Sequence, residues 1–258
     1  MTSPDLLRKI LDAIRELVEE ANIECNESGL QLQAMDYAHV ALVSMMLNDS
    51  AFDPYKCSEQ TMLGININTA LKILKCAGSS DTLTLKTSED SQELKFMFES
   101  VDSDRVFEFS MALMDIDGDH LSIPESEPDA SVAMSSAQFQ RVCRDLTQFG
   151  ETVKIGVNKK SVSFTIVGDS GRGTLTLESV RGDKGDQNVT ITCQEPIEVS
   201  FPLKYLCFFA KAAPIAPTVK ICISNERPLV AEFELEDGAG FIKYYLAPKI
   251  DVDEAEEE

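Results

Sequence analysis

The feature that most constrains this chain is an order of helix and strands that occurs twice. Apolar residues at helical spacing predict four helices, at residues 4–20, 68–77, 136–147 and 203–212. Alternating apolar and polar residues predict strands at residues 30–33, 40–47, 83–87, 94–98, 106–111, 153–157, 162–167, 173–180, 189–193, 219–224, 230–235 and 242–246. Helices combined with strands in this way predict an α+β fold.

The two halves also share a sequence motif. Lys72-Ile-Leu-Lys75-Cys-Ala77 precedes the strand at 83–87, and Phe208-Phe-Ala-Lys211-Ala-Ala213 precedes the strand at 219–224, with a lysine and an alanine in matching places. Internal similarity of this kind predicts two similar domains. Residues 113–129 hold six acids, two prolines and no Lys or Arg, which is typical of an extended, exposed connector. The predicted organisation is a first domain at 1–112, a connector at 113–129, a second domain at 130–250 and a disordered acidic tail at 251–258.

Positive charge is concentrated on the four predicted helices of an otherwise acidic chain. Lys and Arg number 23 against 44 Asp and Glu, so the formal net charge is −21 at pH 7. Helical spacing gives each helix an apolar face and a cationic face. A solvated cationic face is ordinary on one helix, but four in one acidic chain indicate a surface that meets a polyanion. The candidate residues are Arg8, Lys9, Arg15, Lys72, Lys75, Arg141, Arg144, Lys204 and Lys211.

Other functional classes find little support in the sequence. It has no run of about 18 apolar residues, and Pro4 with Asp5 stands where a signal peptide has its apolar core, so a protein inside the cell is expected. Seven cysteines lie far apart without Cys-x-x-Cys spacing, which argues against a disulfide framework or a zinc site. Gly168-Asp-Ser-Gly171 copies part of a serine-protease motif but lies between two predicted strands, where it predicts a hairpin turn. We therefore expect no enzyme activity, no catalytic residues, no metal and no cofactor.

Seven segments spread along the chain identify a family. They are Leu30-Gln-Leu-Gln-Ala-Met-Asp36, His39-Val40, Lys72-Ile-Leu-Lys-Cys-Ala-Gly78, Leu113-Met-Asp-Ile-Asp117, Leu121-x-Ile-Pro124, Arg141-x-Cys-Arg-Asp-Leu146 and Lys243-Tyr-Tyr-Leu-Ala-Pro-Lys-Ile250. From about residue 6 to 250 the chain resembles the eukaryotic DNA sliding clamp family of proliferating cell nuclear antigens. The resemblance implies two similar domains of helices packed on antiparallel sheets, the DNA clamp fold. It also implies a head-to-tail ring of three subunits, with the helices lining a hole for duplex DNA.

The function that the resemblance implies agrees with the charge pattern. It is that of a nuclear, homotrimeric sliding clamp, the processivity factor of DNA replication, which also serves DNA repair. Diffuse Lys and Arg contacts to phosphates suit such a clamp, because they hold duplex DNA without reading its sequence. By resemblance, edge strands at residues 105–112 and 173–180 pair between subunits. The candidate interface residues there are Arg105, Phe107, Phe109, Gly173, Leu175 and Leu177.

The resemblance also implies a docking site for partner proteins. The connector is expected to cover an apolar pocket for a short peptide, the PIP-box motif, which tethers DNA polymerases, ligases, nucleases and the clamp loader. The matching positions are Met35, His39, Val40, Leu42, Leu121, Ile123, Pro228, Tyr245, Ala247 and Pro248. Taken singly, each of them reads as a core or loop residue. Lys159 matches a position that the family modifies with ubiquitin or its relatives, although Lys160 beside it leaves open which lysine is used.

The chain departs from the family at two places, and two other functions compete. The family begins with a short strand before the first helix, whereas Met1-Thr-Ser-Pro-Asp5 reads as a helix cap. Either the first sheet lacks a strand or another segment replaces it. Pro128 in the connector is also atypical. The competing functions are a subunit of a heterotrimeric checkpoint clamp and an acidic chaperone of basic proteins, the second of which would not need four basic helices.

Overall fold

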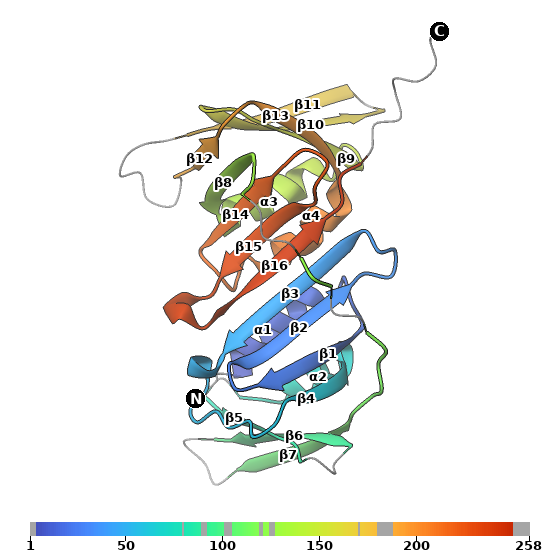
Figure 1. The fold of residues 1–258 in the computed structure, drawn as a ribbon, viewed down its shortest axis with the longest axis vertical. Coiled ribbons are helices and arrows are strands. Elements are labelled where there is room, and N and C mark those ends of the chain that lie inside the picture. Colours follow the sequence, from blue (N-terminus) through green and yellow to red (C-terminus); the bar gives the residue numbers. More distant parts are fainter. Residues whose placement is uncertain are drawn as a thin grey trace. The chain divides into compact units, whose positions relative to one another are not determined.

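The computed structural model describes residues 4–78, 80–88, 92–100, 105–118, 121–123, 127–169, 171–179 and 188–249, and its ribbon is drawn in Figure 1. The chain divides into two compact units. The first comprises Met1–Ile123 with Glu234–Ile242, and the second comprises Pro124–Phe233 with Lys243–Glu258. The predicted acidic tail at 251–258 lies outside the described residues, and the predicted domain boundaries stay predictions. The α+β class is confirmed, with helices and antiparallel sheets in both units.

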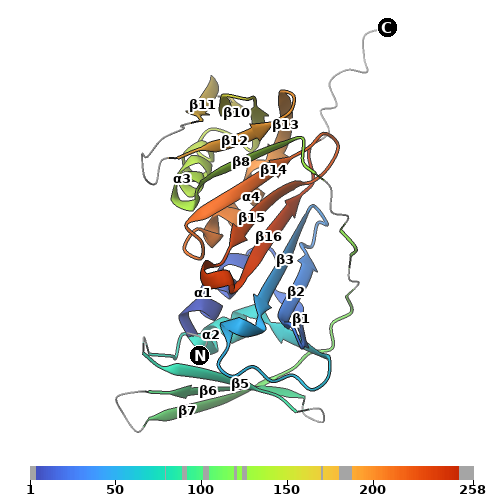
Figure 2. The same ribbon diagram turned by 60° about the vertical axis from the view of Figure 1, so that its left-hand side comes forward.

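The first unit combines a pair of helices with two antiparallel sheets. Helix α1 (Pro4–Ile14) precedes strands β1 (Glu20–Asn26), β2 (Gly29–Met35), β3 (Ala41–Asn48) and β4 (Thr61–Asn66), with a single 3-10 turn, η1 (Asp49–Ala51), after β3. These strands pair in the order β3-β2-β1-β4. Helix α2 (Ile67–Leu74) follows β4 directly and packs against α1 on one face of this sheet, as Figures 1 and 2 show. Strands β5 (Thr82–Lys86), β6 (Glu93–Glu99) and β7 (Val106–Ala112) form the second sheet in that order.

The apolar spacing of the first helix explains both its burial and its early end. Leu7, Ile10 and Ile14 are buried as the helical period predicts. The helix ends at Ile14 and not at residue 20. The Ile14 carbonyl accepts from the Val18 amide at 3.2 Å, as in an α-helix, but also from the Leu17 amide at 2.9 Å, and this three-residue bond tightens the chain into a closing turn. Leu17 and Val18 stay buried in this closing turn, so their apolar side chains extend the helical pattern beyond the helix itself.

The second unit repeats the arrangement of the first. Its elements are β8 (Ala130–Ser135), α3 (Ser136–Leu146), β9 (Thr152–Val157), β10 (Ser161–Gly168), β11 (Gly171–Glu178), β12 (Thr190–Cys193), β13 (Ile197–Pro202), α4 (Leu203–Phe209), η3 (Ala210–Ala212), β14 (Thr218–Ile223), β15 (Leu229–Glu234) and β16 (Gly240–Leu246). The short turn η4 (Glu236–Gly238) between β15 and β16 and the first residues of β16, up to Ile242, belong to the first unit. One sheet has the order β11-β10-β9-β13, and the strands β12-β8-β14-β15-β16 follow one another in the other. The order β11-β10-β9-β13 matches β3-β2-β1-β4, because in each the strand after the first helix is third and the strand before the second helix is last. The predicted internal repeat is therefore confirmed.

Within the described residues, each of the twelve predicted strands corresponds to an observed one, and four further strands were missed. Of the missed strands β1, β4, β8 and β13, the last three each end directly before a helix, and β1 follows the turn that closes α1. One difference between the halves concerns the strand that the family places before its first helix. In the second unit β8 pairs with β14, whereas among the described residues of the first unit no strand pairs with the free side of β5. Of the two alternatives, the described residues fit a first sheet that lacks one strand.

Candidate functional sites

A groove of about 1120 Å3 lies on the first unit, over strands β1, β2 and β3. Its floor is made by outward-pointing side chains that are cross-strand neighbours: Gln33 lies opposite Ser44, and Gln31 opposite Met46. The connector residues Ile116, Asp117, Gly118 and Leu121 also line it. Of the ten predicted pocket residues, Met35, His39 and Leu121 line this groove.

Hydrogen bonds hold the first part of the connector against the sheet. The Gln33 side chain donates from Nε2 to the Leu121 carbonyl at 2.9 Å and accepts from the Leu121 amide at 2.6 Å. The Asn22 side chain donates to the Ile116 carbonyl at 2.8 Å. The Met114 amide donates to the Gly64 carbonyl at 2.8 Å, and a Cβ at Gly64 would lie 2.1 Å from the Met114 carbonyl oxygen, so glycine is needed there. The connector is therefore a fixed wall of the groove along this part of its length.

Sequence reasoning missed the two polar side chains that make this wall. Asn22 and Gln33 belong to no motif quoted for a site, but the alternation of β1 and β2 contained a signal. Asn22 lies on the outward side of β1 between the buried residues Ala21 and Ile23, and Gln33 lies on the outward side of β2 directly after the buried residue Leu32. An amide at such a position can satisfy the main chain of a segment that crosses the sheet.

The loop between β2 and β3 presents His39 at the groove. The Asp36 carboxylate accepts hydrogen bonds from the amides of Val40 and Ala41, each at 2.8 Å, and from the amide of Ala38 at 3.2 Å. These bonds stabilise a tight loop in which His39 has a φ of 55°, a left-handed conformation that is uncommon for a residue with a side chain. Asp36 is itself buried, so its charge is used within the loop.

The remaining predicted pocket residues lie elsewhere. Val40 is half-buried beside the loop, Leu42 is buried in β3, and Ile123 is half-buried at the end of the described connector segment. The other four belong to the second unit. There Pro228 is exposed just before β15, Tyr245 is half-buried in β16, and Ala247 and Pro248 are half-buried after it. The structure thus brings three of the ten together at one groove.

All nine predicted cationic residues lie on the four helices or in the turns that end them. On α1 the positive charges already have acidic partners. Arg8 and Lys9 both pair with Asp5, the latter at 2.9 Å, and Arg15 pairs with Asp12 at 3.1 Å. The hydrogen bond from Lys9 holds the pKa of the Asp5 carboxyl below its ordinary value. The side chains of these pairs are partly exposed, with Arg15 half-buried, so each pair contributes little stability and the cations can still meet a stronger anion.

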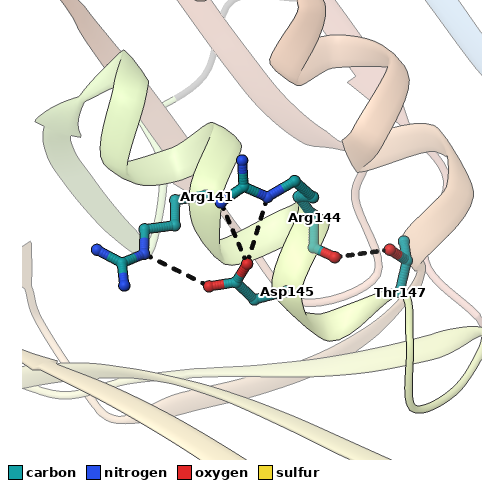
Figure 3. A network of polar contacts seen from close by, with 4 residues as sticks. All are labelled: Arg141, Arg144, Asp145 and Thr147. Atoms are coloured by element: carbon teal, nitrogen blue, oxygen red, sulfur yellow. Dashed lines mark hydrogen bonds and ion pairs between the residues drawn. The ribbon is translucent and has the colours of Figure 1, made fainter.

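Helix α3 carries an acidic residue among its two arginines, which Figure 3 shows. The Asp145 carboxylate lies 3.5 Å from Nε of Arg141 and 3.4 Å from Nε of Arg144. The two arginine side chains remain 76% and 71% exposed, so both guanidinium groups reach solvent. One carboxylate between two arginines leaves a net positive charge on this face. The sequence analysis considered Arg141 and Arg144 as a basic pair and did not consider Asp145 as an ion-pair partner of either.

The predicted cationic residues of helices α2 and α4 and of the turns that end them are all lysines. Lys72 and Lys75 are exposed and have no acidic partner within salt-bridge distance in the described part of the chain. On α4 the Lys204 ammonium lies 5.4 Å from the centre of the Phe208 ring, which holds the charge on the exposed face of the helix. Lys211 is exposed in η3, at the place equivalent to Lys75 in the sequence repeat. The four helices and their closing turns therefore offer cations that water reaches.

The predicted interface strands both lie at sheet edges. Strand β7 pairs with β6 alone, and β11 pairs with β10 alone, within the described residues. Phe107 and Phe109 on β7 are 37% and 42% exposed, while Leu175 and Leu177 on β11 are half-buried. Arg105 is exposed just before β7, and Gly173 is exposed in β11. Both strands therefore combine a free edge with apolar side chains that water reaches.

Hydrogen bonds next to the strands show which edge amides point outward. The Ser179 amide donates to the Lys160 carbonyl at 2.7 Å, so this amide points towards β10. Because successive amides of a strand point in opposite directions, those of Thr174 and Thr176 face the free edge. The Leu113 amide likewise donates to the Gln92 carbonyl at 2.8 Å, so the amides of Glu108 and Ser110 face the free edge of β7. Each edge thus presents several main-chain groups in one row.

The predicted modification site is an exposed turn. Lys159 and Lys160 both lie in the turn between β9 and β10, and both are exposed. The Asn158 side chain accepts hydrogen bonds from the amides of Lys160 and Ser161, at 2.8 and 3.0 Å, which fixes the main chain of the turn. Modification at Lys159 stays a prediction.

Comparison with known proteins gives matches along nearly the whole chain. Residues 1–121 match the N-terminal domain of proliferating cell nuclear antigen, and residues 122–249 match its C-terminal domain. A curated relative from Chaetomium thermophilum, named proliferating cell nuclear antigen, is 45% identical over 250 residues, which cover 96% of this chain and 96% of that protein. Among the described residues, no helix is long and apolar enough to cross a membrane.

Proposed function

Because this chain belongs to the proliferating cell nuclear antigen family and is a DNA sliding clamp, a processivity factor of replication, we propose that three copies close head to tail into a ring. The observation that carries the ring is the pair of free edges at β7 and β11. They belong to different units of the chain, so pairing one with the other joins two subunits through unlike faces. Contacts of that kind build a closed ring when the rotation between subunits returns to its start.

The exposed side chains at the two edges support this pairing. The outward amides of Thr174 and Thr176 and those of Glu108 and Ser110 would continue the sheet across the subunit boundary. Phe107 and Phe109 would leave water where they meet Leu175 and Leu177, at about 25 cal/mol for each square ångström of apolar surface buried. An isolated subunit would leave both edges and these side chains in water.

For DNA, we propose that the nine cations of the helices contact phosphates. They spread over α1, α2, α3 and α4 and the turns that end them, and none of them lines the groove described above. Such contacts hold the duplex through its charge and depend strongly on salt. The acidic remainder of the chain would repel phosphate elsewhere and so favour the helices as the contact surface.

For partner proteins, we propose that the groove with the connector wall binds the aliphatic and aromatic side chains of PIP-box peptides. Met35, His39 and Leu121 would contact the peptide, and Val40, Leu42 and Ile123 of the same unit would support the groove from beside or beneath it. A role of Pro228, Tyr245, Ala247 and Pro248 in peptide binding stays a prediction. Through it DNA polymerases, ligases, nucleases and the clamp loader would be tethered to DNA in the nucleus. The proposal also includes modification at Lys159 and no catalytic step by the chain itself.

Native mass and DNA topology test the proposed ring together. We expect the purified chain to have three times its subunit mass of 28.4 kDa. Once loaded by a clamp loader, it should remain on closed circular DNA in high salt and leave linear DNA, because a ring slides off free ends. A monomer that forms a ring only with other chains would instead favour the heterotrimeric checkpoint clamp. A chain that binds basic proteins and no DNA would favour the acidic chaperone.

A further inference from the structure

Tyr37 is an aromatic side chain that the fold leaves entirely in water beside the groove. Its relative exposure is 102%, the highest among the exposed large apolar and aromatic side chains. The residue nevertheless lines the groove, next to Asp36 and His39. Neither helical nor strand periodicity accounts for it, because it lies in the loop between β2 and β3. A ring in this position contributes nothing to the core.

The loop that carries Tyr37 is held in place by its own hydrogen bonds. Besides the three bonds to the Asp36 carboxylate, the Asp36 amide donates to the Ala41 carbonyl at 2.9 Å and the His39 amide donates to the Asp36 carbonyl at 3.0 Å. The backbone on both sides of Tyr37 is therefore fixed before a ligand arrives. A ligand that contacts the ring then has to order only the side chain, which lowers the entropic cost of binding.

The charge around the groove selects the chemistry of that ligand. Among the described residues that line the groove, Glu20, Glu24, Asp36 and Asp117 are acidic and none is Lys or Arg, but the Asp36 carboxylate is buried and bonded within its own loop. Glu20 and Asp117 are exposed and Glu24 is half-buried, so their carboxylates act on the space above the groove. The face of a tyrosine ring attracts cations, and nearby carboxylates add to this attraction. An aromatic ring in an acidic setting thus favours a cationic side chain.

We propose that Tyr37 is a specificity-determining residue that binds, through its ring face, an arginine beside the aliphatic and aromatic motif of the partner peptide. Arginine suits the site better than lysine because its planar guanidinium group stacks on a ring while its N–H groups stay free to meet carboxylates. The proposal rests on the peptide docking proposed above. It adds a contact at the rim of the groove that makes this clamp favour arginine-flanked partners.

The test uses the full-length chain and labelled peptides with the core Gln-x-x-Ile-x-x-Phe-Phe. One peptide carries arginine just before the core, one carries it just after, and matched peptides carry citrulline, which is neutral and nearly the same shape. We expect one of the arginine peptides to bind about two- to five-fold more tightly than its citrulline match, as for an exposed cation–π contact. Tyr37→Leu should remove this preference and Tyr37→Phe should retain it. Tyr37 lies outside the hydrogen-bond pattern of Asp36, so equal thermal unfolding of both variants serves as the folding control.

The controls separate this proposal from the docking on which it rests. The citrulline peptides should bind wild type and Tyr37→Leu equally, and Leu121→Ala with Ile123→Ala should weaken every peptide. If the citrulline peptides bind wild type and Tyr37→Leu still prefers the arginine peptide, the role of Tyr37 is overturned and the docking proposal stands. Equal loss of arginine and citrulline peptides in Tyr37→Leu would also overturn it, since the ring would then contact the core motif. If no core peptide bound wild type, the docking proposal itself would fail.

Discussion

The side chain of Gln33 and the main chain of Leu121 form two reciprocal hydrogen bonds across 88 residues of sequence, at 2.9 and 2.6 Å. The side-chain amide of Gln33 donates to the Leu121 carbonyl and accepts from the Leu121 N–H, so it supplies the two hydrogen bonds that a neighbouring strand would otherwise supply. A neutral hydrogen bond contributes about 0.5–1.5 kcal/mol net, so the pair contributes about 1–3 kcal/mol to connector attachment. Gln33 on strand β2 thereby fixes the position of the connector, which forms the wall of the groove.

Replacing Gln33 with Leu should release this part of the connector. Leucine has similar size but neither donates nor accepts a hydrogen bond, so the Leu121 amide should exchange its hydrogen about ten-fold faster. Hydrogen exchange read by mass spectrometry or NMR measures this directly. Gln31→Leu is the matched control, because Gln31 lies on the same face of β2 and no connector hydrogen bond involves it in the described residues. Identical exchange in both variants would mean that the connector is held by other contacts.

Reversing one cation on each of three helices should weaken duplex DNA binding. The variant Lys72→Glu, Arg144→Glu, Lys204→Glu removes exposed positive charges from α2, α3 and α4, so affinity should fall and its salt dependence should lessen by about one unit for each phosphate that the helices no longer neutralise. Titration of a fluorescent duplex at several salt concentrations gives both quantities. Reversal of Lys56, Lys86 and Lys220 is the matched control, since these exposed lysines lie outside the helices and the net charge changes equally. An equal loss of affinity in the control would point to net charge and not to the helices.

Thr176→Pro should yield folded monomers. The Thr176 amide faces the free edge of β11, so proline removes one main-chain donor from the subunit contact while β10 keeps its partner. Leu175→Pro is less informative, because the Leu175 amide faces β10 and its loss would break the hairpin itself. Light scattering measures the mass, and Thr176→Ala, which keeps the amide, should remain a trimer. A trimer in the proline variant would place the interface away from this strand.

Alkaline pH should destabilise the fold through its buried thiols. Burial, with the nearby charges of Cys57 and Glu24 adding to it, raises the pKa of the Cys25 thiol from 9.0 to about 12. The folded state then binds more protons than the unfolded state above pH 9, so the free energy of unfolding falls as pH rises from 9 towards 12. Burial also raises the pKa of Cys143 and of Tyr244, which act in the same direction. Urea unfolding at pH 8 and pH 10.5 measures the loss, and it should be smaller for Cys25→Ala than for wild type; equal losses would exclude Cys25 as a contributor.

Local pattern accounts for the elements that sequence reasoning found and for those that it missed. Alternation predicted strands such as β10, where every second residue is buried. The alternation pattern missed β4 and β13 because no loop separates either strand from the helix that follows. For example, β13 ends at Pro202 and α4 begins at Leu203. Sequence reasoning extended the first helix to residue 20 because the apolar side chains of Leu17 and Val18 keep helical spacing in a turn that follows the helix.

The sequence by itself determined the internal repeat, the basic helices, the acidic connector and the family, because period, charge and motif are properties read along the chain. Only the tertiary structure decided that Gln33 holds Leu121, that Asp145 lies between Arg141 and Arg144, and that the amide of Thr176 faces the free edge of β11. Each of these depends on which groups folding brings together, or on how a strand is turned towards its neighbour. A polar side chain looks the same in the sequence whether it meets water or a main-chain group 88 residues away.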